Sequence, residues 1–178
     1  MNDHLSTLKN LTLAPYLLKA TVLISVKRFV GGNQFRHAFS TLGILLDYKY
    51  YNNSVLLKAS LMHDVIEDTD CQDISEIARL DHDGYRVVSL VLEVTKGEDE
   101  TKEEYLERLQ TASKDAKILK CADRISNLTD LHLDTHTNSK IASYLDQTEK
   151  YIIPLAKEVN TDFENELLDL ISKRRKLC

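Results

Sequence analysis

The chain has 178 residues, of which 43% are hydrophobic and 29% are charged, and its formal net charge is −5. This length favours one domain with a core of its own, and this composition is typical of a globular rather than a disordered protein. The acidic balance argues against a nucleic-acid-binding protein, which would carry a basic excess. Five glycines and two prolines are few for a protein rich in tight turns, so helices are favoured over strands.

The cysteines and the N-terminal region indicate the cellular compartment of the protein. Cys71, Cys121 and Cys178 are widely spaced and form no Cys-x-x-Cys pair, so neither a disulfide framework nor a zinc ribbon is indicated. Such sparse cysteines are typical of a reducing compartment. The apolar stretch at 16–30 is interrupted by three basic residues and has no cleavage-site pattern, so we expect neither a signal peptide nor a membrane span. We therefore expect a cytoplasmic protein.

Apolar residues recur at helical spacing along nearly the whole chain. Residues 5–30 are predicted to form one helix after Pro15 or two shorter helices, ended by Gly31-Gly32-Asn33. Thr69-Asp70 is expected to interrupt the pattern again. The segment 85–95 is rich in β-branched residues, but no partner strand is evident, and we predict a helix there. Further helices are predicted at 35–50, 55–67, 73–80, 101–112, 113–131, 138–157 and 161–176. The fold class is therefore all-α, a single bundle-like domain over residues 1–178.

The segment 61–69, Leu-Met-His-Asp-Val-Ile-Glu-Asp-Thr, places four ionisable residues in an apolar helix. Buried charges are costly unless they are paired or bind a metal. His63 and Glu67 are four residues apart, as are Asp64 and Asp68, so each pair shares a face if the helix continues that far. This pattern is difficult to explain by structural needs alone.

Two other predicted helices offer further metal ligands from apolar faces. One carries Asp123, with Asn127 one turn further on, and the other carries His37. Taken singly, His37 could be an ordinary core histidine and Asp123 a partner of Arg124, but the doublet His63-Asp64 favours a metal site. Two imidazoles with two carboxylates suit Mn²⁺, Fe²⁺ or Zn²⁺ better than Ca²⁺. Such an ion polarises a phosphoryl oxygen and activates water.

The doublet His63-Asp64, with His37 upstream and Asp123 downstream, resembles the HD superfamily of metal-dependent phosphohydrolases. The segments 63–69 and 113–128 resemble the two signature segments of the hydrolase domain of RelA/SpoT homologues, and the resemblance spans about residues 20–165. It implies a single HD-domain helical bundle, a stand-alone small alarmone hydrolase. The implied reaction is Mn²⁺-dependent hydrolysis of the 3′-pyrophosphate of (p)ppGpp, giving GDP or GTP and pyrophosphate.

The same resemblance implies roles for individual residues. The residues that match the family's Mn²⁺ ligands are His37, His63, Asp64 and Asp123. Those that match its water-activating acidic pair are Glu67 and Asp68. Those that fall at or near its substrate-binding positions are Arg28, Lys96, Asn127, Lys140 and Tyr144. Because an acidic protein needs local cations to bind an anionic nucleotide, at least some of these basic residues are expected to serve it.

One departure leaves the substrate open. At the first ligand the chain reads Gln34-Phe35-Arg36-His37-Ala38, where the family usually has Tyr-Ile-x-His-Pro. That stretch contributes to the family's nucleotide pocket, so (p)ppApp and NADPH remain alternative substrates. A generic HD nucleotidase and a non-catalytic alarmone-binding module are further alternatives. The Glu67-Asp68 pair argues against the module, since a sensor needs no residues to activate water.

Overall fold

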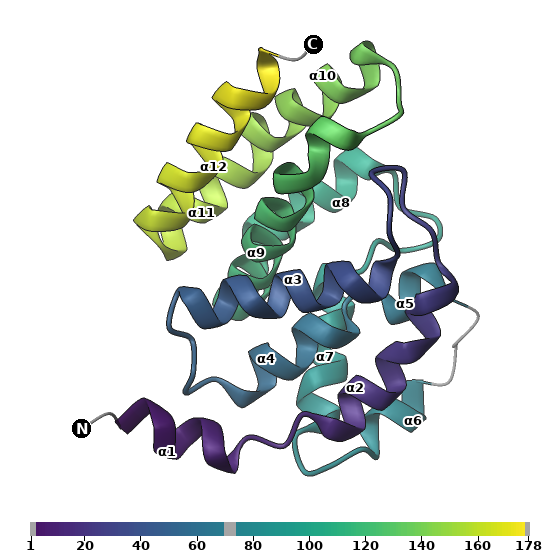
Figure 1. The fold of residues 1–178 in the computed structure, drawn as a ribbon, viewed down its shortest axis with the longest axis vertical. Coiled ribbons are helices and arrows are strands. Elements are labelled where there is room, and N and C mark those ends of the chain that lie inside the picture. The colour runs from purple at the N-terminus through teal and green to yellow at the C-terminus, as the bar shows by residue number, and fades with distance from the viewer. Residues whose placement is uncertain (1–2, 70–73, 177–178) are drawn as a thin grey trace.

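The computed structural model describes residues 3–69 and 74–176, and these residues are mostly helical (Figure 1). Sheet-like pairing is limited, over the same residues, to one isolated bridge between Lys27 and Asn33. The elements in chain order are α1 (Asp3–Asn10), α2 (Ala14–Ala20), η1 (Thr21–Ser25), α3 (Gln34–Asp47), α4 (Ser54–Met62), α5 (Val65–Asp68), α6 (Ile74–Ala78), α7 (Gly84–Val94), α8 (Lys102–Arg108), η2 (Leu109–Thr111), α9 (Lys114–Asp130), η3 (Leu131–Leu133), α10 (Asn138–Gln147), η4 (Thr148–Ile152), α11 (Ile153–Val159) and α12 (Thr161–Arg175). The all-α prediction is confirmed.

Helix α9 is central to the bundle. It packs against α3, α4 and α7 on one side and against α11 and α12 on the other (Figure 1). The first group meets in a core where Leu45, Leu61, Val91 and Leu119 are fully buried. Phe163 of α12 is also fully buried. Burying each such side chain contributes about 1.5–3 kcal/mol, so this packing holds α3, α4 and α9 in fixed register.

Local signals explain where the helices around the site begin. Gly31 and Gly32 have φ of 84° and 71°, a left-handed conformation that glycine adopts without steric cost, and they turn the chain into α3. Asn33 caps α3, its side chain accepting from the N–H of Arg36 at 2.9 Å. Ser113 caps α9 in the same way. These caps fix the first turns of two helices that carry candidate metal ligands.

The predicted continuous helix over 55–67 is wrong, because the chain turns at His63-Asp64 between α4 and α5. Nδ1 of His63 donates to the carbonyl of Ser60 at 2.8 Å. In a continuous helix that carbonyl would accept from the N–H of Asp64. The imidazole thus takes the place of a backbone donor, and the helix is interrupted there, although His63 and Glu67 still line one small cavity.

The other predicted helices are present, with two differences. The stretch 138–157 is divided into α10, the π-helical turn η4 and α11. Pro154 at the start of α11 lacks the N–H that would continue the regular pattern, and a π-turn accommodates the irregularity. The region 5–30 contains α1, α2 and η1, which is close to the second of the two predicted arrangements, but its helical structure ends at Ser25 and not at Gly31-Gly32-Asn33. The predicted break at Asp70 and helix start at residue 73 lie outside the described residues.

A buried charge cluster joins α4 to the loop between α6 and α7. Lys58 is 2% exposed, and its ammonium lies 2.6 Å from Oδ2 of Asp81 and 2.8 Å from Oδ2 of Asp83. The hydroxyl of Tyr16 donates to Asp81 at 2.7 Å. Burial opposes ionisation of Asp81, but the hydrogen bonds from Lys58 and Tyr16 outweigh it and lower its pKa. None of the helices in the described ranges has both the length and the apolar character needed to cross a membrane.

Candidate active site

Three parts of the bundle bring the four expected metal ligands together. His37 comes from α3, His63 and Asp64 from the turn after α4, and Asp123 from α9. Nε2 of His37 lies 3.3 Å from Nε2 of His63 and 3.0 Å from Oδ1 of Asp123. Oδ2 of Asp64 lies 3.6 Å from Nε2 of His37 and 3.3 Å from Nε2 of His63. The four groups therefore face one point inside the protein.

The donor atoms fit a metal ion. Nδ1 of His63 donates to a carbonyl, which can only accept, so Nε2 of the neutral ring presents its lone pair to the centre. Nδ1 of His37 lies 2.9 Å from Oγ of Ser126, which can hold that ring in the same tautomer. Ligands bound at about 2.1 Å lie about 3.0–3.4 Å from one another, the range in which most of these atoms lie. Such close lone pairs would repel one another unless a cation lay among them.

Two further observations support this fit. Oδ2 of Asp64 is buried and makes no hydrogen bond within the described part of the chain. A cavity of about 10 Å³, enough for a single small ion or water, is lined by His63, Asp64, Glu67 and Asp123. His37, His63 and Asp123 offer ligand atoms that all lie within 4.8 Å of one another. The arrangement can thus hold one divalent metal ion.

The carboxylate of Asp123 is kept ionised, as a metal ligand must be. Burial opposes its ionisation, but the charge of Lys120 holds its pKa well below the ordinary value. Lys120 lies one turn before Asp123 on α9, and its Nζ lies 2.7 Å from Oδ2 of Asp123. Oδ1 of Asp123 is thereby turned toward the imidazoles, and Lys120, which also lines the small cavity, neutralises the charge at Oδ2.

The adjacent acidic residues Glu67 and Asp68 face different spaces. Glu67 lines the small cavity of the metal centre, and Asp68 lines a larger pocket beside it. Burial raises the pKa of Glu67 above its ordinary value, and repulsion by Asp64 and Asp68 adds to the rise, although Lys120 opposes it. Burial and Asp64 likewise raise the pKa of Asp68. Glu67 is therefore a better proton acceptor than an ordinary glutamate, and it lies where a water next to the ion would be.

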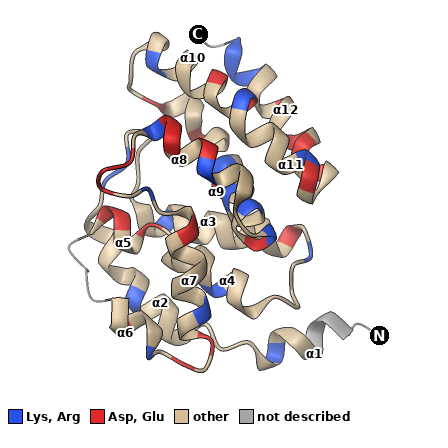
Figure 2. Cartoon of the chain, turned by 180° about the vertical axis from the view of Figure 1, so that it is seen from behind, with Lys and Arg blue, Asp and Glu red and all other residues tan. Residues whose placement is uncertain are grey.

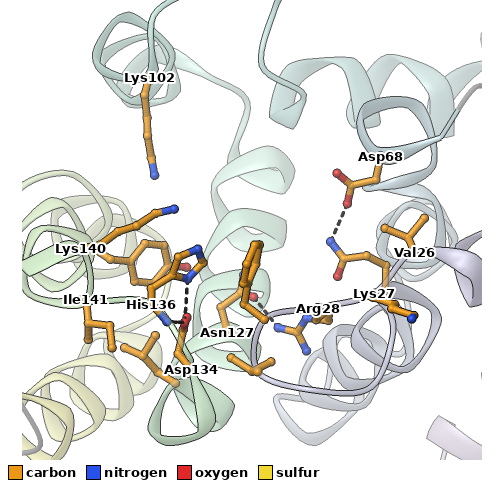
Figure 3. A pocket seen from close by; sticks show the side chains of 15 residues that line it. Val26, Lys27, Arg28, Asp68, Lys102, Asn127, Asp134, His136, Lys140 and Ile141 are labelled. Carbon is orange, nitrogen blue, oxygen red and sulfur yellow. Dashed lines mark hydrogen bonds and ion pairs between the residues drawn. The ribbon is translucent and has the colours of Figure 1, made fainter. Parts of the chain in front are cut away.

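The larger pocket has a volume of about 400 Å³, the size of a small-ligand site (Figure 3). Asn127 joins it to the metal centre. The Nδ2 amino group of Asn127 donates to Oδ1 of Asp123 at 2.6 Å, and its Oδ1 accepts from Arg28 at 2.7 Å. Arg28 is thus held at the pocket wall by the same helix that carries a candidate metal ligand.

Cations gather at this pocket. Figure 3 shows the ammonium groups of Lys102 and Lys140 pointing toward one another. Burial lowers the pKa of Lys102, and repulsion by Arg124, Lys120 and Lys140 lowers it further. The guanidinium of Arg124 lies 4.1 Å from the ring centre of Tyr144, which also lines the pocket. Figure 2 shows Lys and Arg recurring along α9, several of them beside acidic residues. A bound anion would relieve the repulsion at Lys102.

The pocket contains most of the residues expected to bind substrate, namely Arg28, Asn127, Lys140 and Tyr144. It does not contain Lys96, whose ammonium donates to the carbonyls of Gly97 and Glu100. Lys102, which was not among the expected residues, lines the pocket instead. The sequence carries no signal for this position, because Lys102 lies in a strongly charged stretch typical of an exposed helix.

No protein-family model matches the chain. It is similar to the mouse guanosine-3′,5′-bis(diphosphate) 3′-pyrophosphohydrolase MESH1, with 30% identity over 151 residues that cover 81% of this chain and 82% of the mouse protein. Human MESH1 is 29% identical over the same shares, and the Drosophila melanogaster protein is 38% identical over 46% of each chain. A solved structure of a metazoan ortholog of SpoT that hydrolyses ppGpp resembles it with a TM-score of 0.80 and 26% identity, over 91% of this chain and 94% of that one.

Proposed function

Because the chain belongs to the MESH1 family of guanosine-3′,5′-bis(diphosphate) 3′-pyrophosphohydrolases, we propose that it removes the 3′-pyrophosphate of ppGpp and related alarmones. The observation that carries the proposal is the set of four converging donors beside a cationic pocket. Nε2 of His37 lies 3.0 Å from Asp123 and 3.3 Å from Nε2 of His63, and Asn127 connects Asp123 to the pocket wall. A phosphorylated ligand in the pocket would bring a phosphorus close to the ion.

The proposed metal ligands are His37, His63, Asp64 and Asp123, and the proposed ion is Mn²⁺, which suits two imidazoles and two carboxylates with positions left for water and substrate. When bound, the ion polarises a phosphoryl oxygen and makes a neighbouring water more acidic. The support for this assignment is the tautomer of His63 and the unpartnered Oδ2 of Asp64.

The remaining residues bind the substrate and move the proton. Glu67, with its raised pKa, accepts a proton from the attacking water, and Asp68 holds that water on the pocket side. Lys102 and Lys140 bind phosphate oxygens and draw charge away from the phosphorus. The water oxygen bonds to the phosphorus attached to the ribose 3′-oxygen, and the bond between that phosphorus and the 3′-oxygen breaks. The 3′-oxygen takes up a proton to become the hydroxyl of GDP or GTP, and pyrophosphate leaves as a unit.

The test is to incubate purified protein with Mn²⁺ and ppGpp and to follow pyrophosphate and orthophosphate separately, without added pyrophosphatase. We expect pyrophosphate and GDP to appear together from the first time point, and chelated protein to be inactive. Orthophosphate appearing first, with a ribose 3′-monophosphate intermediate, would show a phosphatase instead. Binding of ppGpp without any product would show a sensor.

We also propose a cytoplasmic location. Three widely spaced cysteines are consistent with a reducing compartment, and Cys121 is buried as a free thiol. Microscopy of the tagged full chain tests this, and a signal confined to another compartment would contradict it.

A further inference from the structure

The loop between η3 and α10 forms one wall of the pocket together with the turn before α3. Oγ1 of Thr135 donates to the carbonyl of Phe29 at 3.4 Å. The rings of Phe29 and His136 lie with their centres 4.0 Å apart and their planes at 39°. Both rings line the pocket, next to the apolar side chains of Val26 and Ile141. A flat aromatic base would find stacking partners here, as nucleobases do on aromatic side chains.

Asp134 lies in this wall with one oxygen engaged and the other available. Its Oδ1 accepts from the backbone N–H of His136 at 2.8 Å and lies 2.7 Å from Nδ1 of the same residue. Its Oδ2 has no hydrogen-bond partner among the described residues, although the side chain is only 13% exposed. Figure 3 shows the carboxylate beside His136 on the side of the pocket where Lys140 and Ile141 lie. The wall thus offers an acceptor next to stacking surfaces.

A carboxylate distinguishes the two purines. Guanine presents two donors side by side on its Watson–Crick edge, the N1–H and the N2 amino group, and the available Oδ2 of Asp134 can accept from them. Adenine presents one donor on that edge, its N6 amino group, beside an acceptor at N1 that a carboxylate repels. We propose that Asp134 binds this edge of guanine, so that the enzyme prefers guanine alarmones to (p)ppApp and to NADPH. This inference rests on the proposed function and adds the identity of the base.

The substitution Asp134→Asn tests the inference with little disturbance to the loop. Asparagine keeps Oδ1, which can still accept from both donors of His136, and it replaces Oδ2 with an amino donor. That donor is complementary to N1 of adenine and opposes N1–H of guanine. Asp99→Asn is the matched control, because Asp99 is an exposed carboxylate in a loop away from the pocket.

The readouts are kcat/KM for ppGpp and ppApp, and the affinities of GDP and ADP measured by calorimetry. The wild type should prefer the guanine ligand in both, and Asp134→Asn should lower the guanine-to-adenine ratio by about 10–100-fold, the usual worth of a good side-chain contact to a base edge. The change should lie mainly in KM. Asp99→Asn should leave the ratio unchanged.

Two results separate this inference from the function it rests on. If ppGpp is hydrolysed and the guanine-to-adenine ratio is the same in the wild type and in Asp134→Asn, Asp134 does not recognise guanine. The proposed hydrolase function would remain. If neither alarmone is hydrolysed, the proposed function fails, and the GDP and ADP affinities still decide whether Asp134 selects guanine. Equal affinities in the wild type would then overturn the inference.

Discussion

Replacing Asp64 with asparagine should have opposite effects on stability with and without the metal ion. Oδ2 of Asp64 is buried without a hydrogen bond among the described residues and lies 3.3 Å from Nε2 of His63. In the metal-free protein Asp64→Asn therefore breaks no hydrogen bond and removes a poorly solvated charge. We expect it to stabilise that form by about 1 kcal/mol, the low end of the cost of an unsatisfied buried group.

With the ion present, the wild type should instead be more stable than Asp64→Asn. An ion at 100 times its Kd stabilises the wild type by about 2.7 kcal/mol. For a chain of this size 1 kcal/mol corresponds to about 2–4 °C, so Tm should rise by about 5–11 °C. Loss of even an outer partner of a metal site weakens affinity about 10–100-fold. At a 100-fold loss of affinity, the same ion concentration would stabilise Asp64→Asn by only about 0.4 kcal/mol.

The assay is thermal unfolding of both proteins in chelator and in a Mn²⁺ titration, with Asp99→Asn as a surface control. The two melting curves should change order between the two conditions, and Asp99→Asn should follow the wild type throughout. An equal Mn²⁺-induced shift in wild type and Asp64→Asn would refute the role of Asp64 as a ligand. A wild type that shows no shift at any Mn²⁺ concentration would refute the metal centre.

Three further predictions use other parts of the structure. Glu67→Gln should lower turnover of ppGpp by about 10²–10⁴-fold while leaving the Mn²⁺-induced rise in Tm unchanged, and near-normal turnover would remove Glu67 from the mechanism. Lys58→Met should cost about 3 kcal/mol at pH 7, because it leaves a buried carboxylate unpaired. The pKa of Asp81 is lowered in the folded wild type, so the stability it contributes is present above about pH 4 and is lost as the pH falls through the folded pKa. In Lys58→Met the carboxyl loses the first of the partners that lower this pKa, so its pKa should lie above that in the wild type, and urea denaturation should show the gap between the two proteins narrowing as the pH falls below about 4; a constant gap would contradict this account. Gly84→Ala should lower Tm despite the better helix propensity of alanine, because its Cβ would lie 2.3 Å from the carbonyl oxygen of Ala78, and an unchanged or raised Tm would show that this backbone moves freely.

Most helices could be predicted from the sequence because each buries one apolar stripe. The period of that stripe shows the helix and its approximate ends, as in α3 and α9. The break at His63 could not be predicted in this way. It depends on a side chain that bonds to the carbonyl of Ser60, and apolar periodicity contains no information on such a bond.

The candidate metal centre and the pocket beside it differ in how far the sequence predicts them. Buried His and Asp residues on apolar faces are unusual enough to be recognised one helix at a time. Residues of the pocket are polar and partly exposed, like most surface residues, so only the three-dimensional path of the chain selects them. The loop 95–101 directs Lys96 onto its own carbonyls, and α8 then points Lys102 at the pocket. Asp134 and His136 lie in a polar loop that carries no sequence pattern.

The side-chain amide of Asn127 limits which substitutions the site can accept. Its amino group donates to Asp123 and its oxygen accepts from Arg28, so both neighbours fix the orientation of the amide. A substitution that suits one neighbour alone leaves the other with a like-charged or unpaired group. A substitution at Asn127 should therefore disturb the candidate metal centre and the pocket together, whereas a substitution in the loop that holds Asp134, which contains none of the proposed metal ligands, can change the pocket alone.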